Sequence, residues 1–135
     1  MTKHEFKAAS QTAEAAATAA AVSASPLVGT WTNTDPATRD IVKVIITASG
    51  SGISVEAFGA CSPSPCDWGS VPGLVYAANV SSSTAVAFSA QYTFSFAHVI
   101  LVGHHAGKHL VLESFTQFTD GSGRSNFRST DTMAK

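Results

Sequence analysis

The sequence predicts an all-β domain, an antiparallel up-and-down barrel of about eight strands, preceded by an Ala-rich N-terminal helix. From Leu27 onward, short runs rich in β-branched and aromatic residues alternate with turn sequences. Each run is joined to the next by a short connection, which is the order of a meander that closes on itself. A β-sandwich, the competing architecture, needs longer crossovers than these connections provide. Only 13% of the residues are charged, and closure protects such apolar strands from pairing with other chains.

The length of the chain suits one domain, and a change in composition separates an N-terminal segment from this domain. We expect residues 1–26 to form an N-terminal segment and residues 27–135 to form the barrel. Ala, Glu, Lys and Gln are strong helix formers, so the run His4–Val22 predicts a helix that Ser23–Pro26 ends. The apolar face of this helix consists mainly of alanines, so a chain that lacks residues 1–25 is expected to keep the barrel folded.

The expected strands are β-prone runs that occupy residues 27–33, 41–47, 53–59, 74–79, 84–98, 99–103, 110–118 and 124–132. Turn sequences rich in Gly, Pro, Asp and Ser separate them, at residues 35–38, 49–52, 81–83, 104–107 and 119–123. A further tight turn is expected near Ser95–Ala97, where one strand passes into the next without Gly or Pro.

The segment Cys61–Gly69 is predicted to be a loop, because its two prolines lack the N–H donors of a strand. Cys61 and Cys66 have a spacing that suits a small disulfide loop, and two free thiols are the alternative. Loops of a closed meander alternate between its two ends, so this loop lies at the end away from Trp31. We expect the functional cavity to open at the end that carries this loop.

Charge and hydropathy exclude several classes of partner. The formal net charge is −1 and the basic residues are scattered, which leaves no electrostatic footprint for nucleic acid or an acidic membrane surface. No apolar run reaches the roughly 18–20 residues of a membrane-spanning helix. Glu5 and Glu14 interrupt the N-terminal segment, which lacks the Leu-rich stretch of a signal peptide. We expect a cytoplasmic protein, with secretion as the alternative, and leave self-association open.

The start of the first strand, Gly29-Thr30-Trp31, resembles the G-x-W opening of the calycin superfamily, which includes lipocalins and avidins. The resemblance implies that Trp31 closes one end of the barrel. It also implies that an Arg from the last strand packs across the Trp31 ring, with Arg128 and Arg124 as the candidates, held by cation–π attraction. Avidin-like biotin sites use several tryptophans, whereas this chain has two, so biotin binding is not expected.

A second resemblance covers nearly all of residues 27–132. It rests on three motifs, GTWxNxDPxTR at 29–39, CSPxPCDWG at 61–69 and FTDGSGRS at 118–125. The chain is similar in these motifs to a family of small bacterial and plant single-domain proteins to which no function is assigned. The resemblance implies one domain and carries no mechanism.

The candidate functional residues are those that the barrel could direct into its interior. Phe88, Tyr92, Phe94 and Phe96 share one parity of the long fifth run, and Trp68 lies on the loop above, so these residues are expected to contact a ligand.

Acid–base chemistry could come from four side chains, His98, Tyr92, Glu113 and Asp67. His98 shares the parity of Phe94 and Phe96, and Glu113 shares the parity of Val111 and Phe115, so either could point inward. The neighbouring His104, His105 and His109 are interpreted as a polar hairpin tip, and no metal site is expected.

Together these features predict a barrel that binds a small, largely apolar organic molecule in its cavity. The alternative is an isomerase or cyclase that works without a cofactor, acting on a small organic substrate of the secondary-metabolite kind held in the same cavity. No nucleotide-binding loop or nucleophile motif is present, so no cofactor is expected.

Overall fold

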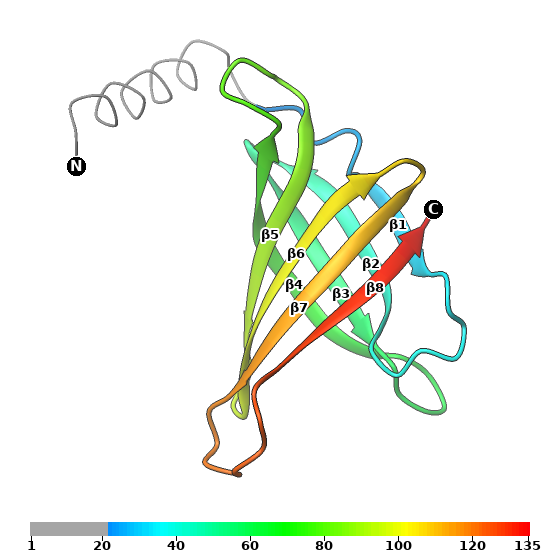
Figure 1. The fold of residues 1–135 in the computed structure, drawn as a ribbon, viewed down its shortest axis with the longest axis vertical. Coiled ribbons are helices and arrows are strands. Elements are labelled where there is room, and N and C mark those ends of the chain that lie inside the picture. Colours follow the sequence, from blue (N-terminus) through cyan, green and yellow to red (C-terminus); the bar gives the residue numbers. More distant parts are fainter. Residues whose placement is uncertain (1–21) are drawn as a thin grey trace, which may run out of the picture.

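The computed structural model describes residues 22–135 and shows a closed antiparallel barrel of eight strands arranged in chain order (Figure 1). The strands are β1 (Gly29–Asn33), β2 (Ile41–Ser49), β3 (Gly52–Gly59), β4 (Cys66–Ala77), β5 (Ala85–Thr93), β6 (Ala97–Ala106), β7 (His109–Phe118) and β8 (Phe127–Ala134). Pairing between β1 and β8 closes the ring. The predicted all-β up-and-down barrel is confirmed, whereas all of the predicted N-terminal helix but Val22 lies outside the described residues.

Several of the expected boundaries are wrong, among them those of β4, β5, β6 and β8. β4 begins at Cys66, so only the first part of the predicted loop is irregular, and the strand also contains Pro72. Pro72 is tolerated because the β4–β5 ladder begins one residue later, at Gly73, so no β5 partner is lost at this position. His104 and His105 belong to β6 rather than to a turn, since the chain reverses at Gly107, which has a φ of +62°.

The tight turn expected between the fifth and sixth strands is present. β5 ends at Thr93, and the Phe94 N–H donates a hydrogen bond to the Ala97 carbonyl oxygen at 2.8 Å. Thr93 and His98 are then direct cross-strand partners and lie on the same face of the sheet. The turn therefore shifts the inward positions from even numbers on β5 to odd numbers on β6.

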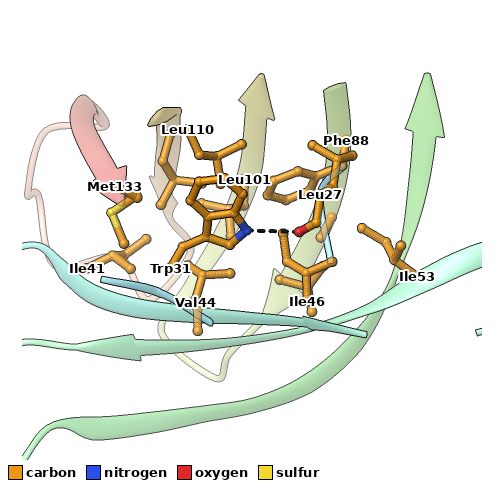
Figure 2. Packing of buried hydrophobic residues seen from close by; sticks show 14 of the residues in the cluster. Leu27, Trp31, Ile41, Val44, Ile46, Ile53, Phe88, Leu101, Leu110 and Met133 are labelled. Carbon is orange, nitrogen blue, oxygen red and sulfur yellow. Dashed lines mark hydrogen bonds between the residues drawn. The ribbon is translucent and has the colours of Figure 1, made fainter. Parts of the chain in front are cut away.

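One end of the barrel is filled by apolar side chains around Trp31 (Figure 2). Trp31 is 1% exposed, and its Nε1–H donates to the Leu27 carbonyl oxygen at 2.8 Å. Leu27, Val44 and Leu110 are fully buried in the same cluster. The prediction that Trp31 is buried at a closed end is confirmed.

The cation at the Trp31 ring is Lys135, whose Nζ lies 4.9 Å from the ring centroid, and not the expected Arg128 or Arg124. Arg128 pairs with Glu113 on the outside of the barrel. Arg124 lies over the Phe118 ring, beyond the opposite end of β8. The register of closure explains the difference, because it pairs Ala134 with β1 and so carries the residue after it to Trp31.

The segment that precedes β1, residues 22–28, packs against the barrel. Ser23 accepts a hydrogen bond from the Ala85 N–H at 2.8 Å and donates one to the Ser83 carbonyl oxygen at 2.7 Å. Ala24 is buried, and the Pro26 carbonyl oxygen lies 2.7 Å from a ring nitrogen of His105. Residues 23–26 thus contribute to the closed end of the barrel.

These contacts predict how much stability a truncated chain loses. A chain that lacks residues 1–25 should fold but lose about 1–2 kcal/mol, because four backbone hydrogen bonds of Ser23 and Ala24 and the burial of Ala24 disappear. A chain that lacks only residues 1–21 keeps all of these contacts and should melt like the full chain. Thermal unfolding of the three chains is the measurement, and equal melting temperatures for both truncations would contradict the contribution of residues 23–26 to the closed end.

Candidate functional site

A pocket of about 470 Å³ opens at the end of the barrel opposite Trp31, among the β1–β2, β3–β4, β5–β6 and β7–β8 connections. Its walls are formed by Arg39, Asp40, Ile41, Gly59, Ala60, Cys61, Cys66, Asp67, Trp68, Phe94, Phe96, Ala97, Val99, Ser114, Thr116, Phe118, Phe127 and Ser129. The pocket lies at the end predicted from the alternation of loops, beside the Cys61–Cys66 segment. That it is the functional cavity stays a prediction.

Aromatic rings form one wall of the pocket. The Trp68 ring contacts Tyr92 and Phe94 edge-on, with centroid separations of 5.4 and 5.6 Å. Phe94 stacks on Phe96 at 5.5 Å, nearly parallel. Such edge-on and offset arrangements each add to the burial energy of the rings and hold them in place. The wall therefore presents a preformed apolar surface to the pocket.

A β-bulge in β4 directs Trp68 inward. Between the pairs Glu56–Ser70 and Phe58–Asp67, one residue of β3 faces two of β4, Trp68 and Gly69. Gly69 has a φ of +86°, which suits the extra residue of a bulge. The parity of β4 changes there, so Trp68 faces the interior although Ser70 faces outward.

Gly59 and Tyr92 complete the support of Trp68. A Cβ atom at Gly59 would lie 2.8 Å from Trp68 Nε1, so the absence of a side chain there makes room for the indole. Tyr92 Oη accepts a hydrogen bond from the Ala57 N–H at 3.0 Å and has the Val55 and Gly69 carbonyl oxygens within 3.0 and 2.9 Å. The Tyr92 hydroxyl thereby accepts from one backbone N–H near the bulge and has two carbonyl oxygens within reach of its single proton.

Replacing Tyr92 by Phe should cost about 1–3 kcal/mol of folding free energy, because it leaves the Ala57 N–H buried without a partner. Tyr76→Phe is the matched control: its hydroxyl bonds Ser89 Oγ at 2.8 Å on the exposed face, so little change is expected. Urea unfolding measures both, and equal losses would contradict the role given to Tyr92.

The free energy of unfolding should depend on pH at alkaline values because of Tyr92. Burial raises the pKa of Tyr92 above the ordinary value of 10.0. The hydrogen bond from Ala57 opposes this rise, and the negative charges of Asp67 and Glu56 add to it. The unfolded chain then ionises at lower pH than the native protein does. The stability due to Tyr92 is therefore complete below about pH 10 and is lost as the pH rises through the raised pKa. Tyr92→Phe should lack this loss.

Hydroxyl groups form a second wall of the pocket, on β7 and β8. The Ser114 and Ser129 hydroxyl oxygens lie 3.1 Å apart and share a hydrogen bond, and Ser114 is only 7% exposed. Thr116 follows on the inward row of β7. Hydroxyl groups are thus the polar groups offered by the inner walls.

Charged groups and a disulfide lie at the rim. The disulfide joins Cys61 to Cys66, which settles the two alternatives in favour of the bridged form. Asp67 Oδ1 accepts a hydrogen bond from the Gly69 N–H at 2.8 Å. A hydrogen bond with Asp67 and the loss of hydration raise the pKa of Glu56, while Lys43 opposes the shift. The charged residues that line the pocket, Arg39, Asp40 and Asp67, are all exposed at its mouth.

Two of the four candidate acid–base residues lie on the outer face of the barrel. His98 is the cross-strand partner of Thr93, and its ring nitrogens contact Thr93 Oγ1 at 3.2 Å and Gln91 Oε1 at 3.1 Å. Glu113 pairs with Arg128 at 3.2 Å, because Leu112 and Ser114 take the inward positions of β7. The even-numbered residues of β6 and the odd-numbered residues of β7 face outward, so the expectation that His98 or Glu113 could point inward is wrong.

The other candidates divide between the pocket and the core. Trp68, Phe94 and Phe96 line the pocket and Asp67 lies at its rim. Tyr92 and Phe88 are 2% and 1% exposed and belong to the core. The Phe88 ring packs over Gly103, where a Cβ atom would overlap the ring.

Sequence reasoning missed the inward polar residues of β7 and β8. Ser114, Thr116 and Ser129 line the pocket, and Asp131 follows Ser129 on the inward row. Asp131 accepts a hydrogen bond from Asn33 Nδ2 at 3.0 Å, and burial raises its pKa. The placement of Glu113 between Leu112 and Ser114 could have assigned the β7 side chains, because Ser114 continues the parity of Leu110 and Leu112.

Comparison with known proteins assigns no relative to the chain: no protein-family model, curated protein or solved structure matches it. Within residues 22–135, no three His, Cys, Asp or Glu side chains converge as a metal site. The described part of the chain also contains no helix of the length and apolarity needed to cross a membrane.

Proposed function

We propose that this protein binds a small, largely apolar organic molecule in the open-ended pocket. The observation that carries the proposal is the contrast between the two ends of the barrel. The Trp31 end is packed with side chains, whereas about 470 Å³ remains open beneath a preformed aromatic wall at the other end. Pockets of roughly 300–1,000 Å³ with apolar walls and few polar groups are typical of ligand sites.

The alternative, an isomerase or cyclase that needs no cofactor, draws less support from the same geometry. General acid–base catalysis needs a titratable side chain within hydrogen-bond reach of the reacting atoms. The titratable groups that border the pocket are rim residues, namely Arg39, Asp40 and Asp67. The inner walls offer hydroxyl groups and rings, which suit binding and orientation better than proton transfer. Catalysis in this pocket would depend mainly on positioning of the substrate.

N-phenyl-1-naphthylamine, an uncharged probe that brightens in apolar surroundings, tests the proposal. It should bind saturably at one site and raise the melting temperature of the protein. Trp68→Phe should weaken binding about tenfold, since it removes contact area worth about 1.4 kcal/mol from the wall. Phe88→Leu is the control, because Phe88 lies in the core and its loss should lower stability without changing affinity.

Two results would contradict the proposal. One is the absence of saturable binding by this probe and by comparable uncharged molecules. The other is a Trp68→Phe variant with unchanged affinity and lower stability, which would make Trp68 a structural plug of the barrel.

A further inference from the structure

The pocket has two chemically different walls that face one another. In a ring of eight strands, β4 and β8 are four strands apart and lie on opposite sides, and in Figure 1 β7 and β8 cross in front of β3 and β4. Trp68 comes from β4, and Phe94 follows the end of β5. Ser114 comes from β7 and Ser129 from β8. A molecule in the pocket therefore lies between an aromatic wall and a hydroxyl wall.

The hydroxyl wall has hydrogen-bonding capacity that the protein does not use. A serine hydroxyl has one proton to donate and two lone pairs to accept with. The bond between Ser114 and Ser129 uses one of their two protons, and neither hydroxyl has another partner within residues 22–135. The remaining proton and lone pairs are available to a group in the pocket.

The aromatic wall also carries an unused donor. Trp68 Nε1–H has no hydrogen-bond partner among residues 22–135, and the atom is not fully buried. The Thr116 hydroxyl on the facing wall likewise has no hydrogen-bond partner among these residues and is not fully buried. Each of these groups can bond a hydroxyl or carbonyl oxygen on the rim of a flat ligand.

Among the residues that line the pocket, charged side chains occur only at the mouth, and Asp131, the next inward residue after Ser129, is hydrogen-bonded to Asn33. Of the residues that line the pocket, the charged ones are Arg39, Asp40 and Asp67. An ion inserted between the walls would lose its hydration without meeting a counter-charge among the lining residues, which disfavours charged groups there. The inserted part of a ligand must therefore be uncharged.

We propose that the pocket selects a planar, uncharged aromatic molecule with a hydroxyl or carbonyl group on one edge. Its ring packs against Trp68 and Phe94, and its polar edge bonds the Ser114–Ser129 hydroxyl pair. This inference rests on the proposed function, because it names the class of molecule that the same pocket binds.

Three molecules with one ring system, naphthalene, 2-naphthol and 2-naphthoate, separate the contributions of the ring, the hydroxyl and the charge. Displacement of N-phenyl-1-naphthylamine at neutral pH measures their affinities. We expect 2-naphthol to bind about tenfold more tightly than naphthalene, as one buried hydrogen bond implies. The 2-naphthoate anion should bind more weakly than either.

The serine variants locate the effect. In the double variant Ser114→Ala, Ser129→Ala, the affinity for 2-naphthol should fall to that for naphthalene, while naphthalene itself binds as before. Unchanged naphthalene binding shows that the pocket is intact. Thr130→Ala is the control, since it removes an exposed hydroxyl from the outward face of the same strand.

Several outcomes overturn the inference. Equal affinities of the wild type for naphthalene and 2-naphthol would show that the Ser114–Ser129 pair does not bind the ligand hydroxyl. The proposed function would be unaffected by that result. Preferential binding of 2-naphthoate would show that a rim cation such as Arg39 governs selection. If neither the probe nor any of the three molecules binds, the proposed function fails, and this inference fails with it.

Discussion

Replacing Trp31 by Ala is expected to lower the free energy of unfolding by about 3–5 kcal/mol. The side chain is 1% exposed and lies at the centre of the packed end, surrounded by Val44, Leu110 and Met133 (Figure 2). Its removal leaves a cavity that the strands cannot close without breaking their ladders. The Leu27 carbonyl oxygen also loses the hydrogen bond that it accepts from Trp31 Nε1–H, in which nitrogen and oxygen are 2.8 Å apart.

Urea unfolding of the wild type and the variant measures this loss. Domains of this kind are stable by about 5–15 kcal/mol, so the variant should lie close to the limit of folding. Trp31→Phe is the control, since it keeps most of the apolar volume and loses the indole N–H, and a smaller loss is expected. A cost below about 1 kcal/mol for Trp31→Ala would show that Trp31 does not hold the closed end together.

The second large effect is expected on binding. Val99 lies on the inward row of β6, is 3% exposed and lines the pocket. Val99→Trp places an indole in the open space, so the affinity for N-phenyl-1-naphthylamine should fall at least about 100-fold, equivalent to about 2.7 kcal/mol. The pocket has room for the added atoms, so the loss of stability should be small compared with overpacking a filled core.

Val102→Trp provides the matched control on the same strand. Val102 is three residues further along and faces outward, so the same substitution adds an indole outside the barrel. Its affinity for the probe should equal that of the wild type. Equal affinities for the two Trp variants would place the binding site elsewhere on the protein and contradict the proposed function.

The number and order of the strands were determined by the sequence itself. Runs of β-prone residues between turn residues are local features, and a meander with short connections has few ways to protect its edges other than closure. The alternation of loops between the two ends follows from the same order. It was enough to place the segment Cys61–Gly69, of which residues 61–65 form the loop, at the end opposite Trp31, where the pocket lies.

The direction of individual side chains was decided by the tertiary structure. A strand alternates with a period of two, but each bulge or turn resets which positions face inward. The bulge at Gly69 turned Trp68 into the pocket, and the turn after Thr93 put His98 on the outside. The Tyr92 hydroxyl, 23 residues from Gly69 in the sequence, holds that bulge in place.

The hydroxyl wall and the cation on Trp31 depend on the tertiary structure in the same way. Ser114 and Ser129 meet because β7 and β8 pair in one register, and Lys135 reaches Trp31 because β8 closes on β1 in another. A register is fixed by the sum of hydrogen bonds and packing along whole strands. The sequence therefore determined the barrel and its two ends, while pairing between distant strands decided which residues line the pocket.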